Sequence, residues 1–316
     1  MEHKSIHRFI RIAQITLIFI FIVIIAGSIV RATGSGMGCP DWPKCFGKWI
    51  PPTDVSQLPD NYKELYAGEH NAVDEFNALK TWTEYLNRLA GVVLGVLVFI
   101  QLIFSVIIMK HDKRIFVLSF LSVIMVGFQG WLGAKVVSSN LAPMKITIHM
   151  VMALVILAVA VAIIYRAKKL ISPALEKSAQ PVIIQLSAIV LFFTIMQIML
   201  GTQVREEVDV LLKNFDAAFR GDIISNLGIT FNIHRSFSIA IMLVNFFMIY
   251  KINKSDASDS LKKLGKILGV VLIAELLAGI ILNRFALPAP LQPIHLLLAC
   301  IAYALQFLII LKVVKK

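Results

Sequence analysis

Three histidines of this chain stand at the start of long apolar stretches. His149 opens KITIHMVMALVILAVAVAII, and His295 opens QPIHLLLACIAYALQFLII. His234 opens a third stretch and is followed directly by Arg235. Neutral imidazole ligates heme iron, and two histidines on facing helices of a four-helix bundle can clamp one flat cofactor. We therefore expect His234 and His295 to bind the iron of one heme.

Arginines stand beside these histidines, at the same ends of the apolar stretches. A guanidinium matches carboxylate geometry with paired hydrogen bonds, so these arginines could bind heme propionates. The candidates are Arg31, Arg88, Arg205 and Arg235. The alternative is that histidines and arginines at these positions only contact lipid headgroups.

Glu84 is a candidate catalytic acid. It precedes Asn87 by one helical turn and shares a helix face with Arg88 by i,i+4 spacing. A carboxylate at the start of a helix can also serve only as a partner of the helix dipole. From the residues alone, the catalytic and the structural roles of Glu84 stay open.

Cys39 and Cys45 lie in CPDWPKC, just beyond the first apolar stretch. A disulfide is permitted on the outer side of a cell membrane, because that compartment is oxidising. We predict a structural or redox-active disulfide, with a zinc site as the alternative. Cys300 lies inside the last apolar stretch and is predicted to be a small core residue.

Membrane helices must position these residues. Hydrophobic residues make up 58% of the chain and charged residues 16%, which is more apolar and less charged than a soluble domain. Roughly twenty apolar residues span a bilayer as a helix. The sequence predicts an all-α membrane protein with eight transmembrane helices, at about Ile12–Val30, Leu89–Met109, Ile115–Ala134, Ile146–Tyr165, Val182–Val204, Ile229–Tyr250, Ile267–Leu282 and Pro293–Leu311.

Positive charge indicates the orientation of these helices. More than half of the Lys and Arg residues fall at 4–11, 110–114, 166–177, 251–266 and 312–316. The positive-inside rule places these segments, and both termini, in the cytoplasm. The net charge of +12 is attributed to this topology, so no nucleic-acid partner is expected. No small-residue cleavage site follows the first stretch, so we expect an uncleaved first helix.

The two halves of the chain resemble each other. Gln129 and Glu275 lie at the same distance before His149 and His295, and a glycine follows each of them one helical turn later. The first and fifth stretches both end in G-x-x-V-R. We expect two parallel four-helix halves, 1–170 and 171–316, with a long outer loop at 31–80. Gln129 and Glu275 are predicted to form hydrogen bonds between helices.

Taken in order, several segments resemble the heme A synthase family, the CtaA/Cox15-like membrane enzymes. They are GSIVRATGSGMGC, EYLNR, QGWLGA, KITIH, FNIHRSF and PIH, and the resemblance covers nearly the whole chain. The paired cysteines resemble the cysteine-bearing bacterial branch. Family members oxidise a methyl group of heme O to a formyl group, giving heme A for terminal oxidases. The resemblance therefore implies a heme-dependent oxidoreductase of the bacterial inner membrane, with heme sites toward the outer face.

The resemblance also implies roles for individual residues. The C-terminal half would bind heme b through His234 and His295. The N-terminal half would hold the iron of the substrate, heme O, through His149, and Glu84 would be the essential glutamate. The expected partners are heme O, a heme O synthase, an electron donor and the lipid bilayer, with a homo-oligomer left open.

Asn87 departs from the family pattern, because E-x-x-H-R is usual where this chain has Glu84-Tyr85-Leu86-Asn87-Arg88. Asparagine is a poor ligand for heme iron. We expect either a five-coordinate iron with one open position, or His70 as a substitute ligand, or an N-terminal half without activity. We favour the five-coordinate iron, because Glu84 and His149 are both present.

Two rival functions stay open at this point. A bis-histidine membrane cytochrome b would carry electrons only, but it requires a ligand pair in each half, and Asn87 leaves one pair incomplete. A transporter would place its substrate-binding residues near the middle of the membrane. Only Gln129 and Glu275 meet that requirement.

Overall fold

The fold is given by a computed structural model that describes residues 2–66, 75–172, 180–214 and 223–314. Within these ranges the chain is helical and no β-strand occurs, as predicted. Eight helices are long and apolar enough to cross a membrane. They are α1 (Glu2–Ala32), α3 (Ala78–Ile108), α4 (Lys113–Ser138), α5 (Pro143–Ile171), α6 (Pro181–Asn214), α7 (Ile229–Lys254), α8 (Asp259–Arg284) and α9 (Leu291–Val313).

The helices expose apolar side chains and bury polar ones. On α3, the exposed residues Val92, Val96 and Phe99 recur every three or four positions and form a stripe on one helix face. Gln101 and Ser105 of the same helix are buried. This is the pattern of a helix with lipid on one side and protein on the other. The chain is a multi-pass membrane protein.

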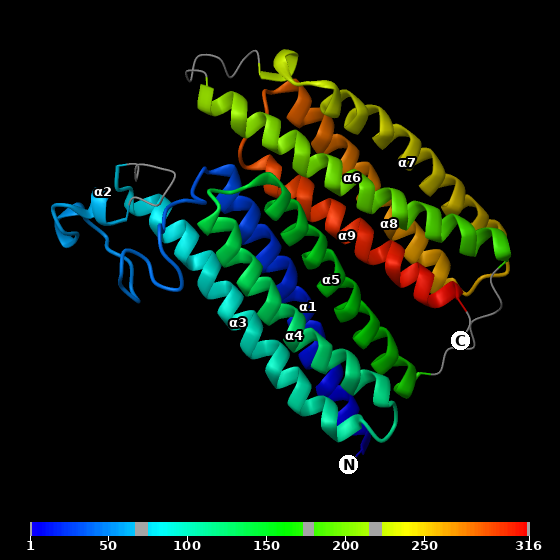
Figure 1. The fold of residues 1–316 in the computed structure, drawn as a ribbon. Coiled ribbons are helices and arrows are strands. Elements are labelled where there is room, and N and C mark those ends of the chain that lie inside the picture. The colour runs from blue at the N-terminus through cyan, green and yellow to red at the C-terminus, as the bar shows by residue number, and fades with distance from the viewer. Residues whose placement is uncertain (1, 67–74, 173–179, 215–222, 315–316) are drawn as a thin grey trace.

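The helices form two groups of four (Figure 1). In the first group α1 packs against α3 and α5, and α4 packs against both of these; in the second, α6 packs against α7 and α9, and α8 packs against both of these. Between the groups α1 contacts α9, α5 contacts α6, and α5 contacts α9. Helices at corresponding positions of the two groups therefore make corresponding contacts. The largest core cluster includes Leu157 of α5, Ile198 of α6 and Tyr303 of α9, so it joins the groups.

The connections that precede His149 and His295 have the same backbone path. Asn140 and Leu141 both have positive φ, at 54° and 61°, and Ala286 and Leu287 have φ of 52° and 58°. Leu141 N donates to Val136 O at 3.0 Å, and Leu287 N donates to Leu282 O at 2.9 Å. These bonds close the ends of α4 and α8 in the same way, with left-handed residues after the last turn.

Several helices extend beyond the apolar stretches that predicted them. Helix α3 begins at Ala78, where the Asn77 side chain accepts a hydrogen bond from Lys80 N at 3.0 Å and caps the helix. Glu84 was predicted at the start of this helix but lies well inside it. Helix α6 continues to Asn214, so Arg205 has helical neighbours beyond the predicted end at Val204. Hydropathy locates the part of a helix inside the membrane and not its polar extension.

Both chain termini lie at one end of the helices, and the segment that carries α2 (Tyr62–Leu65) and the 3-10 helix η1 (Val55–Gln57) lies at the other end (Figure 1). This segment connects α1 to α3. The residues that the sequence predicted as functional gather at the end of the bundle that carries α2.

Candidate functional site

Each of the three histidines packs its ring against a glycine of the neighbouring helix. A Cβ atom added to the glycine would lie 3.3 to 3.5 Å from the ring carbon Cε1, so the ring packs closely against the helix at the glycine. The pairs are Gly133 with His149 at 3.5 Å, Gly201 with His234 at 3.3 Å, and Gly279 with His295 at 3.4 Å. All three rings are partly buried.

Asn87 occupies the fourth position of this kind. Its Oδ1 would lie 3.7 Å from a Cβ atom on Gly27 of α1. Asn87 on α3 therefore packs beside Gly27 of α1, just as His234 on α7 packs beside Gly201 of α6. Among the described residues, the carboxamide of Asn87 has no hydrogen-bond partner. The side chain at the fourth position thus lacks an imidazole but keeps the glycine neighbour.

Two of the histidines each accept, at their backbone carbonyl, a hydrogen bond from a glutamine side chain on the neighbouring helix. Gln129 Nε2 donates to the backbone carbonyl of His149 at 3.0 Å, and Gln197 Nε2 donates to that of His234 at 2.9 Å. Gln129 was predicted to bond between helices, and this prediction is confirmed. Gln197 was missed, although it precedes Gly201 by one helical turn, as Gln129 precedes Gly133.

Glu275 takes the same place beside His295. Its Oε1 lies 3.2 Å from His295 Nδ1, although the two atoms are not aligned for a full hydrogen bond. The side chains predicted to form one ligand pair stand on α7 and α9, which both pack against α6 and α8.

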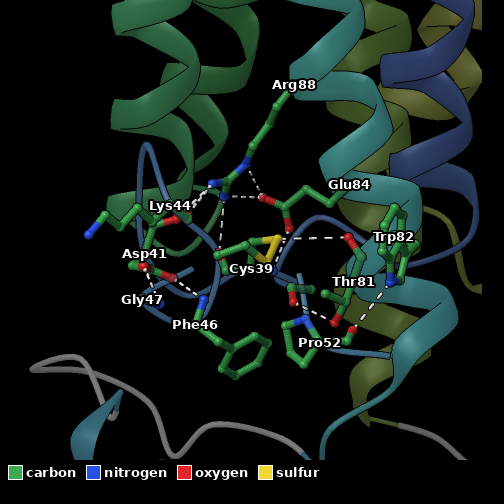
Figure 2. The surroundings of a disulfide bond; sticks show 12 residues. Cys39, Asp41, Lys44, Phe46, Gly47, Pro52, Thr81, Trp82, Glu84 and Arg88 are labelled. Carbon is green, nitrogen blue, oxygen red and sulfur yellow. Dashed lines mark hydrogen bonds and ion pairs between the residues drawn. A yellow bond between two sulfur atoms is a disulfide. The ribbon is translucent and has the colours of Figure 1, made fainter. Parts of the chain in front are cut away.

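Glu84 and Arg88 form a buried ion pair beside the loop that follows α1 (Figure 2). Arg88 Nε donates to Glu84 Oε1 at 3.1 Å, and Cys39 N donates to Glu84 Oε2 at 2.9 Å. Arg88 also donates to the carbonyl oxygens of Asp41 at 2.7 Å, Lys44 at 3.0 Å and Cys39 at 3.1 Å. The guanidinium thus fastens the loop to α3.

Cys39 and Cys45 are joined in a disulfide, as predicted. Within the described part of the chain, no group of three or more metal-binding side chains occurs, so nothing there favours the zinc alternative. Both cysteines are fully buried, in a cluster with Phe46, Leu58 and Tyr62. Cys300 is free and buried in α9, also as predicted.

The disulfide loop rests directly on the first turns of α3. A Cβ atom on Gly38 would lie 2.5 Å from Lys80 O, so only glycine permits this approach. Thr81 Oγ1 donates to Gly38 O at 2.8 Å, and Trp82 Nε1 donates to Pro52 O at 3.2 Å (Figure 2). Burial, together with the charge of Asp41, raises the pKa of Tyr66 in the same loop. The loop is packed against α3, and its Cys39 N–H holds the Glu84 carboxylate in place.

Arg31 and Arg205 meet at one carboxylate between the two groups of helices. Asp209 Oδ2 lies 3.1 Å from Arg31 Nη2, and Asp209 Oδ1 lies 2.7 Å from Arg205 Nη2. Arg205 also donates to Gln292 Oε1 at 2.8 Å. Asp209 was not among the residues predicted from the sequence, although its i,i+4 spacing from Arg205 was an available signal.

The remaining predicted residues lie apart from these networks. Arg235 is exposed. Its Nη2 donates to Asn232 Oδ1 at 3.3 Å, and its guanidinium carbon lies 5.7 Å from the centre of the Phe231 ring. His70, the proposed substitute ligand, lies outside the described residues.

The site thus combines three histidines that pack against glycines with the buried carboxylate of Glu84. A family profile described as COX15-CtaA, cytochrome oxidase assembly protein, matches residues 10–307. The chain belongs to the COX15-CtaA family. The matched range includes every predicted site residue, from Arg31 to His295.

Curated relatives of this chain are named heme A synthase. The protein from Shewanella oneidensis is 30% identical over 188 residues, which cover 60% of this chain and 54% of that protein. The protein from Alkalihalophilus pseudofirmus is 32% identical over 136 residues, 43% of this chain and 38% of its own length. The chain thus spans about half the length, or less, of these relatives. The protein from Flavobacterium johnsoniae is 22% identical over 314 residues, 89% of this chain and 91% of its own.

Proposed function

We propose that this protein is a heme A synthase, which oxidises a methyl group of heme O to the formyl group of heme A. The family membership carries this proposal. The local geometry supports it, because three partly buried imidazoles and one buried carboxylate gather at one end of the helices. A cytochrome b that only carries electrons is not favoured, since Asn87 replaces one ligand of the second pair.

We infer that residues 1–170 and 171–316 form parallel repeats, as the matching helix contacts and turns support. The positive-inside rule places both termini in the cytoplasm. The histidines and the disulfide then lie toward the outer face of the bacterial inner membrane. An oxidising compartment on that side is consistent with the Cys39–Cys45 bond.

In the C-terminal half, His234 and His295 are the proposed ligands of heme b. Their surroundings fit this group, because both histidines are partly exposed and each packs ring carbon Cε1 closely against a glycine of the neighbouring helix. Bound heme b would supply one-electron redox chemistry. The protein contributes the orientation of the two imidazoles and an apolar setting.

In the N-terminal half, His149 is the proposed ligand for the iron of heme O. Asn87 provides no second imidazole, so the iron is five-coordinate in this proposal. Glu84 is the proposed catalytic residue, orienting the substrate or relaying protons at its carboxylate. Its hydrogen bonds to Arg88 and Cys39 hold that carboxylate in one position.

The arginines divide into two kinds. Arg235 is exposed and follows His234 directly, so we assign it first to a heme propionate. Arg31, Arg88 and Arg205 already bind protein oxygens. For these three, binding a propionate requires an exchange of partners. A heme O synthase and an electron donor remain the proposed protein partners.

The test is to purify the protein from cells that make heme O and to separate its extracted hemes by chromatography. Heme b, heme O and heme A are expected together. Glu84→Gln should make heme O accumulate while heme b persists, whereas Glu64→Gln in the exposed α2 segment should behave as the wild type. Full heme A production by Glu84→Gln would remove Glu84 from the reaction. A protein without any heme would overturn the proposed function.

A further inference from the structure

The three histidine positions differ in the side chain that approaches them from the neighbouring helix. Gln129 and Gln197 present carboxamides to the residues His149 and His234. Glu275 presents a carboxyl group to His295. The carboxyl group therefore distinguishes one proposed ligand of heme b from the other.

The contact involves the ring nitrogen that would not bind iron. His295 Nδ1 lies 3.2 Å from Glu275 Oε1. His295 Nδ1 and the second carboxyl oxygen, Oε2, are both buried without a hydrogen-bond partner. Within the described residues, the only ion-pair distance involving Glu275 is the one to His295. A small rotation of the ring would align Nδ1–H with Glu275 and leave Nε2 for a metal.

A ligating histidine that donates its other N–H to a carboxylate becomes a more basic ligand and keeps one tautomer and orientation. A more basic ligand stabilises the ferric state over the ferrous state, which lowers the reduction potential of the heme. A carboxamide oxygen is a weaker acceptor and has a smaller effect.

We propose that Glu275 is a positioning residue which lowers the reduction potential of heme b by accepting a hydrogen bond from His295 Nδ1. This inference rests on the proposed function, because it requires a heme between His234 and His295. In this role Glu275 acts through His295 and does not touch the heme.

The simplest alternative is that Glu275 only fastens α8 to α9, as Gln197 fastens α6 to α7. The side chain at this place could then be exchanged between glutamate and glutamine without any effect on the heme. The two roles therefore predict different potentials for Glu275→Gln.

The experiment is a spectroelectrochemical titration of heme b in the purified full-length protein. Glu275→Gln installs the side chain found at the other two positions, and it should shift the potential upward with the heme b content unchanged. Gln197→Ala is the control, because it removes a contact to the backbone carbonyl of His234 and none to its ring, and it should leave the potential unchanged. Glu275→Asp, which keeps the carboxyl group, should lie closer to the wild type than Glu275→Gln.

An unchanged potential in Glu275→Gln with full heme content would overturn this inference. If Glu275→Gln fails to retain heme, Glu275→Asp decides, because the shorter side chain draws the carboxyl group away from Nδ1: an upward shift supports the inference and an unchanged potential overturns it. Absence of heme from the wild-type protein would instead refute the proposed function.

Discussion

Asp209 of α6 holds Arg31 of α1 by two hydrogen bonds to Oδ2, at 3.2 Å from Nε and 3.1 Å from Nη2. The other carboxylate oxygen binds Arg205, which also donates to the backbone carbonyl of Arg31 at 3.0 Å. One carboxylate thus bridges the two arginines that end the G-x-x-V-R segments. This contact joins the two groups of helices at the end that carries the histidines.

Asp209→Ala should destabilise the protein by about 1–2 kcal/mol. The two guanidinium groups lose a charged acceptor, which typically costs about 1.5–3 kcal/mol, and partial exposure to solvent reduces that effect. Thermal unfolding in detergent measures the change. Glu206→Ala on the same helix is the control, because Glu206 has no ion-pair partner among the described residues. Equal stability of both variants would show that the bridge contributes nothing.

Removal of the disulfide should loosen Glu84. Cys39→Ser opens a small loop, which costs about 2 kcal/mol in the chain-entropy model. It also frees the backbone of residue 39, which binds both Glu84 and Arg88. We expect less heme A and faster proteolysis of the outer loop, measured by chromatography and limited digestion. Cys300→Ser is the matched control, and wild-type heme A production by Cys39→Ser would contradict this link.

Asn87→His should provide the second ligand that the N-terminal site lacks. Gly27 has no Cβ atom and leaves space beside Asn87, as Gly201 does beside His234. The absorption spectrum should change from high-spin to low-spin at the N-terminal heme, because two imidazoles then ligate the iron. Asn87→Gln, which lengthens the side chain without an imidazole, should leave the spectrum unchanged. A wild-type spectrum for Asn87→His with full heme content would show that the positions are not equivalent.

Gly201→Ala should weaken heme b binding on the order of 10-fold, the effect typical of residues that orient a ligand. The added Cβ atom would lie 3.3 Å from His234 Cε1 and displace the ring. The heme b content after purification measures the loss. Gly127→Ala is the control, since nothing lies within 4 Å of a Cβ atom there. Equal heme content in the two variants would argue against the packing role of Gly201.

The sequence alone determined the membrane helices, because each one is encoded by a local apolar stretch. It also placed the three histidines at helix ends and predicted the disulfide, because Cys39 and Cys45 lie close together in one segment, with a zinc site as the alternative. The repeated spacing of Gln129 and Glu275 before a histidine was visible for the same reason. These features depend on residues that are close together in the chain or that repeat at a fixed distance.

Only the tertiary structure decided which polar groups bind one another across the helices. Arg31 meets Asp209 at a separation of 178 positions, and Cys39 reaches Glu84 at a separation of 45. Arg88 was predicted to bind a propionate, yet its guanidinium binds loop carbonyls that hydropathy cannot locate. Such contacts depend on how helices pack and where polar extensions fold back. Local periodicity determines that a helix forms, and packing determines which side chains meet.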